Sequence, residues 1–404
     1  MKRILLFSVL SILFLDSIAQ ASEDKNLDRV QSMKAGKGLS IGTGAGLINK
    51  EFVVEKNNAA TQVKNQQSTG TCWSFSTTAL LESQLLKNNA GNFDLSEMFT
   101  VRNIYIEKAK NYILRQGAAQ FGEGGLGHDV IRTVSKYGAI PESVYSGHQP
   151  GEYIFNHVKM ATDLKSYLDS ILRGRIKLRR QTNLSDNWME GFVKILDENM
   201  GVPPTEFVYN NKRYTPQTFA KEVMKFDAGD YVNITSFTHQ PFYAPYILEV
   251  PDNFSNGMYY NIPLKEMLEL TKSTIRNGYT LMWDADVSNS GFQPKVGVAL
   301  SLDSNRNVTE ELSADASETR WDEKIRQRLY ENLTTQDDHL MQITGLAKSK
   351  AGKQFFIVKN SYGVVGPFNG YVEVSESYFA INTISLLVPK AALSKSLLDK
   401  LKLN

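Results

Sequence analysis

Cysteine is the scarcest residue type in this 404-residue sequence, because Cys72 is the only one. A single cysteine cannot form an intramolecular disulfide, although exported proteins usually pair their cysteines. Neither a Cys-x-x-Cys nor a His-x-x-x-His spacing occurs, and Asp338 beside His339 has no second histidine at ligand spacing. We therefore expect no metal site and no cofactor. The unpaired thiol needs a different explanation.

Long apolar runs are also missing, apart from residues 4–15. Lys2 and Arg3 precede this run, and the small residues Ala19 and Ala21 follow it. The pattern predicts a secretory signal peptide over residues 1–21, with an uncleaved N-terminal anchor as the alternative. No cysteine follows the run, which excludes a lipid-attachment site of the bacterial lipoprotein kind. We expect an exported chain that is periplasmic or secreted.

A large excess of either charge is absent as well, since the sequence contains 45 lysines and arginines and 43 aspartates and glutamates. Removal of residues 1–21 would leave a formal charge of about +1, so we expect no nucleic-acid partner and no membrane association after signal removal. The one basic cluster, over residues 173–180, has two interpretations, a solvated face or a site for a polyanion.

The apolar pattern changes once along the chain. Residues 22–50 are polar and then glycine-rich, which predicts a flexible lead-in. Helical spacing follows over residues 73–87, 95–114, 129–137 and 155–200, and short alternating runs follow over 231–234, 280–287, 339–347 and 354–359. We therefore predict an α+β domain over 51–390, with a mainly helical half (51–228) that contains an insertion, and a sheet-rich half (229–390). Residues 391–404 form a tail, in which Leu393, Leu397 and Leu401 have the spacing of a terminal amphipathic helix.

Cys72 opens the first predicted helix, directly after a turn-forming Ser-Thr-Gly-Thr segment. The free N–H groups and the dipole of a helix N-terminus lower the pKa of a thiol. This position predicts a thiolate nucleophile. An inert buried thiol is the alternative, because free cysteine is often fully buried.

A thiol nucleophile needs an imidazole partner, and His339 has a suitable context. His339 begins one predicted strand and Asn360 follows the next, across a turn centred near Ser349 and Lys350. The two residue numbers sum to 699, twice that centre, so we predict that His339 and Asn360 face each other across a hairpin. Asn360 would then orient the ring. A purely structural histidine is the alternative.

Acyl transfer develops negative charge on the attacked oxygen, which requires hydrogen-bond donors. Gln66 precedes the thiol by six residues and can supply a side-chain N–H beside the backbone N–H of Cys72. The order Gln, Cys, His, Asn favours catalysis over four unrelated residues.

These residues resemble the papain-like cysteine peptidases, through Val63-Lys-Asn-Gln, Cys72-Trp-Ser-Phe and Asn360-Ser-Tyr-Gly. The stretches Leu95-Ser-Glu-Met and His339-Leu-Met-Gln-Ile-Thr-Gly are closer to the bleomycin hydrolase and aminopeptidase C branch. The resemblance covers roughly residues 50–390 and implies the papain-like two-part fold.

The resemblance implies a role for each matching residue. Cys72 would be the nucleophile, His339 the general acid and base, Asn360 the orienting amide and Gln66 the oxyanion donor. Gly124 and Gly125 look like the glycine pair whose backbone binds the substrate as an added strand, although a simple turn explains them equally well.

Three departures from the family pattern matter. Thr69 replaces the cysteine of a papain disulfide, and Tyr362 replaces the usual tryptophan. The Trp-Asp-Pro-like tail, whose terminal carboxylate holds the substrate amine in this branch, is absent from residues 391–404.

We therefore expect a cysteine peptidase that acts on peptides through a Cys72 thioester, as an aminopeptidase. The alternatives are an endopeptidase with an open cleft and a non-catalytic peptide-binding protein on the same fold. Family members often form hexamers, which leaves a homo-oligomer open.

Overall fold

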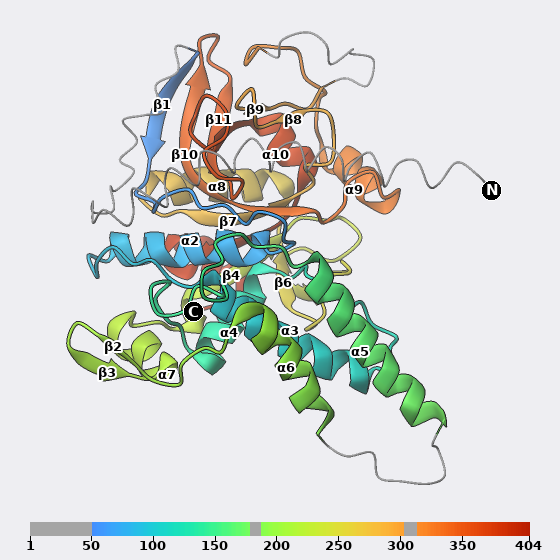
Figure 1. The fold of residues 1–404 in the computed structure, drawn as a ribbon. Coiled ribbons are helices and arrows are strands. Elements are labelled where there is room, and N and C mark those ends of the chain that lie inside the picture. The colour runs from blue at the N-terminus through green and yellow to red at the C-terminus, as the bar shows by residue number, and fades with distance from the viewer. Residues whose placement is uncertain (1–50, 178–186, 303–312) are drawn as a thin grey trace.

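A computed structural model describes residues 51–177, 187–302 and 313–404. The predicted signal peptide and lead-in, residues 1–50, lie outside the described residues. A helical part and a sheet part pack together, and the helix that begins at Cys72 lies between them (Figure 1).

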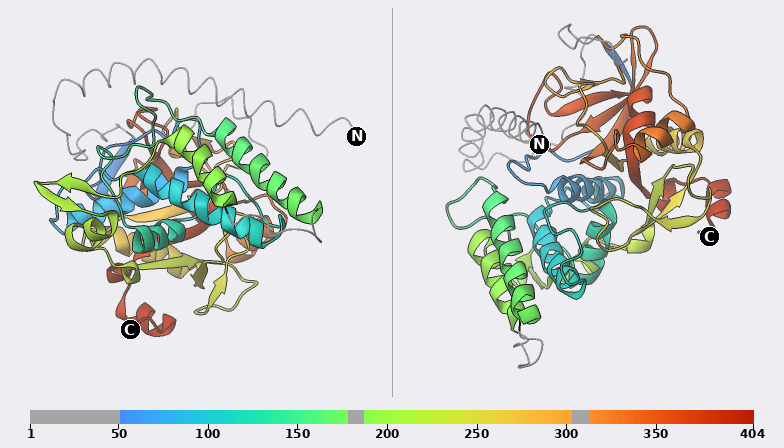
Figure 2. Two further views of the ribbon diagram at one scale, coloured as in Figure 1. Left: turned by 60° about the horizontal axis from the view of Figure 1, so that its bottom comes forward. Right: turned by 90° about the vertical axis from the view of Figure 1, so that its right-hand side faces the viewer.

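The helical part follows the predicted periodicity closely. Its helices are α2 (Cys72–Lys87), α3 (Glu97–Leu114), α4 (Gly127–Tyr137), α5 (Val158–Lys177) and α6 (Trp188–Met200). Ser96 begins α3 as an N-cap whose side chain accepts from the N–H of Phe99, which is the expected role of serine there. Helices α5 and α6 lie side by side and extend away from the sheet (Figures 1 and 2). A small hairpin and short helical turns follow: β2 (Phe207–Tyr209), β3 (Lys212–Tyr214), α7 (Pro216–Thr218) and η2 (Phe219–Val223).

One 11-stranded sheet organises the rest of the described chain. Its order is β5-β6-β4-β13-β7-β10-β11-β12-β9-β8, and β1 pairs with β10 outside this path. The strands are β1 (Phe52–Asn57), β4 (Tyr231–Thr235), β5 (Pro245–Ile247), β6 (Met258–Asn261), β7 (Leu281–Ala285), β8 (Phe292–Gln293), β9 (Val298–Ala299), β10 (His339–Ser349), β11 (Gln354–Lys359), β12 (Tyr371–Ser375) and β13 (Thr383–Pro389). Strand β1 comes from the predicted helical half, so the chain enters the sheet before it forms α2.

The two faces of the sheet bury different partners. Met282, Leu340 and Leu387 pack with Cys72, Trp73 and the helical part. The neighbouring positions along the same strands point to the opposite face, because side chains alternate along a strand. That face packs against α8 (Leu264–Arg276), α10 (Glu376–Asn382), η4 (Lys390–Ala392) and α11 (Lys395–Leu401). Of the other helices in the described chain, η3 (Ala228–Asp230) contacts α4, and α9 (Glu323–Glu331) contacts α10.

The chain ends in α11 on the second face. Leu393, Leu397 and Leu401 are buried there, as their spacing predicts, although the helix begins only at Lys395. Lys400 pairs with Glu266 of α8 at 2.9 Å. In both views of Figure 2 this end lies at the edge of the molecule. The C-terminus therefore lies across the sheet from Cys72.

Among residues 51–177, 187–302 and 313–404, we find no helix with the length and apolar character needed to cross a bilayer.

Gln342 of β10 fastens the sheet to α2. Its buried Nε2 lies 3.0 Å from the carbonyl oxygen of Ala79 and 2.8 Å from Oγ of Ser83, both in α2. It also lies 3.0 Å from Oγ1 of Thr280. A buried side-chain amide, rather than an apolar side chain, thus lies at the centre of the interface between β10 and α2.

Replacing Gln342 with leucine tests this contact. Leucine keeps the volume but leaves the buried hydroxyls of Ser83 and Thr280 without this partner. We expect the free energy of unfolding to fall by about 1–3 kcal/mol, the usual cost of an unmade buried hydrogen bond. Urea denaturation measures this, with the exposed Gln336→Leu as control. Equal stability of the two variants would show that the amide is dispensable.

Candidate active site

Cys72 is the first residue of α2, where the sequence predicted it. Thr71 occupies the N-cap without a side-chain cap, and its carbonyl accepts from the N–H of Ser74 and Phe75. The N–H groups at the start of α2 therefore need partners from outside the helix. Gly70 is held from outside, because its N–H donates to Glu123 Oε2 at 2.9 Å.

The protonation state of the thiol differs from the sequence prediction. Burial raises the pKa of Cys72 to about 12, while the N–H of Leu340, which bonds the sulfur, lowers it. Negative charges on Asp337, Asp284 and Asp252 raise it further. The prediction of a thiolate considered only the helix terminus, and here desolvation outweighs that effect. The thiol is neutral at pH 7 in this structure.

His339 begins β10 and bonds Asn360, as predicted. Its Nε2 lies 2.7 Å from Oδ1 of Asn360, and the N–H of Ser361 donates to the same oxygen at 2.7 Å. An oxygen that accepts from Ser361 requires Nε2 of His339 to carry its proton. In the neutral ring Nδ1 is then the acceptor. Tyr362 stacks on the ring at 4.7 Å between centroids and 25° between planes.

Burial lowers the pKa of His339 to about 4, and the bond to Asn360 acts in the opposite direction. The imidazole is therefore neutral at pH 7. It can accept a proton at Nδ1.

The predicted hairpin register is wrong, although the predicted contact exists. Gln342 pairs with Lys359, and a bulge follows between Ile343 and Gly345. By this register His339 lies beyond the last paired position of β11, and its strand partner is Ala285 of β7. The error lies in the turn, which is centred at Ala351 rather than between Ser349 and Lys350, because Lys348 pairs with Gln354. The bulge shifts the register by only one residue. The contact with Asn360 is a diagonal one made just past the strand end.

The sulfur approaches β10 at the start of that strand. It bonds the N–H of Leu340, which directly follows His339. Among the described residues, no hydrogen bond joins the sulfur to the His339 ring. The thiol of Cys72 thus lies next to Leu340, the residue after His339. All four predicted catalytic residues are buried. The exposed fractions are 7% for Cys72, 3% for His339, 4% for Asn360 and 6% for Gln66.

Gln66 is tied to the same segment as Asn360. Its N–H donates to the carbonyl oxygen of Ser361 at 2.9 Å, and Ser361 Oγ donates to Gln66 Oε1 at 2.6 Å. Gln66 Nε2 donates to the carbonyl oxygen of Thr69 at 2.7 Å, which leaves one of its two protons uncommitted. Ser361 therefore holds both amides. Sequence reasoning did not assign it a role, although it directly follows Asn360.

Gly124 and Gly125 lie outside any helix or strand, directly before α4. A Cβ on Gly125 would lie about 3.0 Å from ring atoms of Trp73, and a Cβ on Gly124 would overlap the carboxylate of Asp252. Neither glycine has a positive φ, so close approach explains the glycines better than a turn does.

A buried ionic network lies beneath the site. Lys64 Nζ bonds Glu97 Oε1 at 2.6 Å, and Lys359 Nζ donates to Thr61 Oγ1 at 3.0 Å. Thr61 Oγ1 in turn donates to Glu82 Oε2 of α2 at 2.5 Å. Burial lowers the pKa of Lys359 to about 8 and raises that of Glu97 to about 7. The network fixes the backbone close to both amides of the site.

In the described part of the chain, no group of three or more histidine, cysteine or acidic side chains has the geometry of a metal site.

Comparison with known proteins identifies relatives for nearly the whole chain. A model of the Peptidase C1-like family matches residues 118–404, and a model of the papain family cysteine protease matches residues 49–167. Aminopeptidase C of Streptococcus thermophilus is 23% identical over 87% of this chain and 85% of its own length. Bleomycin hydrolase of Rattus norvegicus is 23% identical over 84% of this chain and 83% of its own length. The crystal structure of PepW from Lactobacillus rhamnosis HN001 superposes with a TM-score of 0.69 at 19% identity, covering 100% of this chain and 96% of that one. These matches confirm the predicted fold class.

Alkylation of the single cysteine tests its protonation state. A thiol whose pKa lies near 12 forms thiolate only as the pH rises, so the fraction that reacts grows about tenfold per unit. We expect the rate of labelling by iodoacetamide to increase steadily from pH 6 to pH 9. Cys72→Ser is the control and should not label. A rate that is already constant between pH 5 and pH 8 would instead reveal a thiolate and imidazolium pair.

Proposed function

This chain belongs to the Peptidase C1-like family and is a papain-family cysteine peptidase, and on that premise we propose that it acts as an aminopeptidase. The substrates would be peptides with a free N-terminus. The single observation that carries the proposal is the hydrogen-bonded set of His339, Asn360, Ser361 and Gln66 beside the N-terminus of the helix that begins with Cys72.

In the first step the Cys72 sulfur attacks the carbonyl carbon of the first peptide bond. The thiol proton passes to Nδ1 of His339, because Nε2 is already committed to Asn360. The oxygen that gains negative charge is met by the free N–H of Gln66 and the backbone N–H of Cys72. Preorganised donors of this kind typically contribute 10²–10³-fold to the rate.

In the second step the C–N bond breaks, and His339 returns the proton to the leaving amine. The product is a thioester on Cys72. Water then attacks the thioester while His339 accepts a proton from it, and the acid product leaves as the thiol is restored. The first step begins from a neutral thiol and a neutral imidazole, which agrees with the pKa directions of Cys72 and His339. Hydrolysis of the thioester again begins with His339 neutral.

Relatives named aminopeptidase C, aminopeptidase W and bleomycin hydrolase support the exopeptidase assignment. The position of α11 indicates that the substrate's free amine is not held by the C-terminal tail, as the family resemblance implied. Here α11 packs on the opposite face of the sheet, with Lys400 bonded to Glu266 and Tyr243. Helix α11 therefore does not enter the site at Cys72.

Paired substrates test this proposal. We expect leucyl-7-amido-4-methylcoumarin to be hydrolysed at least tenfold faster than its N-acetyl counterpart, with no hydrolysis of either by Cys72→Ala. A chain extended by Gly-Ser after Asn404 serves as control and should keep the same ratio. Equal hydrolysis of the two substrates would indicate an endopeptidase. Absence of turnover together with normal iodoacetamide labelling would indicate a peptide-binding protein.

We further propose that the chain is exported, on the basis of the signal-peptide pattern in residues 1–21. We expect N-terminal sequencing of protein recovered from the periplasm or medium of an expressing bacterium to begin at Ser22. Recovery of the intact chain from the cytoplasm alone would overturn this assignment.

A further inference from the structure

Three aspartates from separate segments lie close enough to the sulfur for their charges to act on it. Asp252 lies between β5 and β6, Asp284 is in β7, and Asp337 lies two residues before β10. Besides burial, the charges on Asp337, Asp284 and Asp252 raise the pKa of Cys72. None of these carboxyls takes part in the proposed acyl-transfer steps.

Asp284 is fully buried and lies opposite Leu340, on the sheet face that contacts α2. Its Oδ2 accepts from Ser385 Oγ at 2.9 Å, whereas Oδ1 is buried without any hydrogen-bond partner in the described part of the chain. The carboxyl of Asp337 is in hydrogen-bond contact with that of Asp284. Burial raises the pKa of Asp284 to about 7. Asp337 can donate to Asp284 only while one of the two carboxyls is protonated, so when both are ionised the buried oxygen needs a donor from outside.

Asp252 lies directly against Gly124. A Cβ on this glycine would overlap the Asp252 carboxylate, so glycine is required for the carboxylate to come so close. Gln120 Nε2 donates to Asp252 Oδ1 at 2.9 Å, and the side chain is half-buried. The Asp252 carboxylate therefore lies beside Gly124, whose backbone would pair with the substrate according to the family resemblance.

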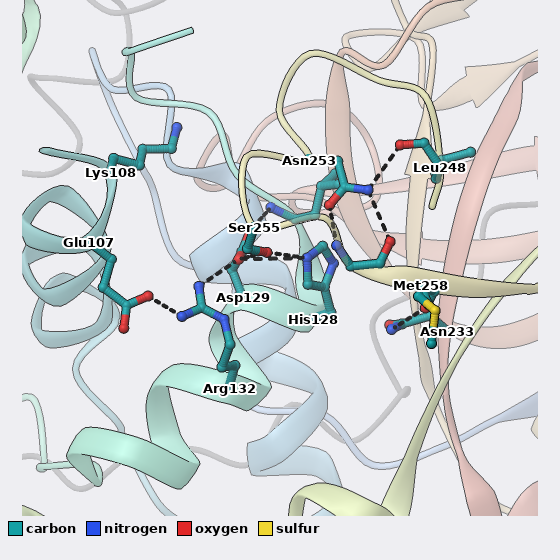
Figure 3. A network of polar contacts seen from close by, with 12 residues as sticks. Glu107, Lys108, His128, Asp129, Arg132, Asn233, Leu248, Asn253, Ser255 and Met258 are labelled. Atoms are coloured by element: carbon teal, nitrogen blue, oxygen red, sulfur yellow. Dashed lines mark hydrogen bonds and ion pairs between the residues drawn. The ribbon is translucent and has the colours of Figure 1, made fainter. Parts of the chain in front are cut away.

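The segment that carries Asp252 is rigidly anchored (Figure 3). Asn253 Nδ2 donates to two backbone carbonyls of the same segment at 2.9 and 3.0 Å. Ser255 Oγ donates to Asp129 Oδ1 at 2.8 Å and lies 2.8 Å from Nε2 of His128. Both partners belong to α4, so the loop is fixed to a helix. A carboxylate held in this way is preorganised for a ligand.

The three aspartates lack a cationic partner. Among the described residues, no lysine, arginine or histidine nitrogen lies within 4.0 Å of their carboxyl oxygens. The charge of Lys108 acts on Asp252 and Asp337, but its Nζ is committed to the carbonyl oxygens of Gly122 and Gly124. By contrast, the neighbouring Asp129 pairs with Arg132 at 2.8 Å. Unpaired buried carboxyls are costly, so they favour a cation from outside.

We propose that Asp252, Asp284 and Asp337 form a subsite that binds the substrate's free α-ammonium group. This assignment rests on the proposed function and deepens it, because it names the groups that would select a free N-terminus. An ammonium group carries three donors and one positive charge, which suits the unsatisfied oxygen and the clustered carboxyls. These aspartates would supply the negative charge that α11, on the far face of the sheet, does not bring to the site.

The matched substrates used above test the assignment with Asp252→Asn and Asp337→Asn, singly and together. Both side chains are half-buried, and asparagine preserves their shape. We expect each change to lower kcat/KM for the free-amine substrate about tenfold or more, chiefly through KM. Hydrolysis of the N-acetyl substrate should not fall, because this substrate has no charge for the carboxylates to bind and loss of a negative charge lowers the pKa of Cys72.

Asp230→Asn is the control, because it removes an exposed aspartate that no site residue contacts. Retained preference for the free amine in the double variant, with turnover intact, would overturn the subsite and leave the peptidase assignment standing. A second pair of substrates, the acetyl-Lys-Ala and acetyl-norleucyl-Ala amides of the same coumarin, distinguishes an α-ammonium group from a lysine side-chain ammonium group as the ligand. An aspartate-dependent preference for lysine would place a side-chain ammonium in the same subsite.

Binding to an inactive chain keeps the two proposals distinguishable. In Cys72→Ala, calorimetry should show leucinamide binding that weakens about tenfold in Asp252→Asn and Asp337→Asn. N-acetylleucinamide should bind equally to all three proteins. Equal binding of the two amides to Cys72→Ala would reject the subsite, whether or not the wild type hydrolyses peptides.

Discussion

The site depends on the docking of α2 against β10. Cys72 begins the helix and His339 begins the strand, so the angle and depth of this one contact decide where sulfur and imidazole lie. Gln342 fixes it through a buried amide that reaches Ala79, 263 positions away in the chain. A polar contact suits this task because a hydrogen bond has a defined geometry, whereas apolar packing tolerates sliding. The interface thereby fixes the relative position of two distant segments.

A second set of contacts positions the two amides relative to that interface. Ser361 bonds Gln66 and, through its N–H, the side chain of Asn360, so one residue orients the oxyanion donor and the ring partner together. Lys64 and Lys359 flank these segments and are bound to buried acids and hydroxyls beneath them. Displacement of Lys64 would leave the buried Glu97 without its cation at a cost of several kcal/mol, and displacement of Lys359 would break its buried bond to Thr61. The ionic network therefore keeps the loop before α2 and the end of β11 in one arrangement.

Local features of the site were predictable from sequence, and features that depend on tertiary burial were not. Helix periodicity and the turn before Cys72 located the start of α2, and strand patterns located the hairpin that brings His339 to Asn360. The register of that hairpin was wrong because composition placed the turn one to two residues too early, whereas Lys348 pairs with Gln354 around a centre at Ala351. The thiol was predicted to be ionised because a helix terminus is visible in sequence, whereas desolvation is not. Asp252, Asp284 and Asp337 come from three separate segments, and no motif links them.

Thiol ionisation and substrate recognition are coupled through these aspartates. Their negative charges raise the pKa of Cys72, and burial strengthens each interaction because the local dielectric is low. A positive charge bound among them would cancel much of that effect and lower the pKa of the thiol. By linkage, a ligand that favours the thiolate is itself bound more tightly when the thiol is ionised. A free N-terminus would then contribute twice, by binding to the carboxyls and by easing proton transfer from Cys72 to His339. Such coupling keeps the sulfur unreactive until a charged substrate end arrives, which explains how a nucleophile can remain neutral in an otherwise complete site.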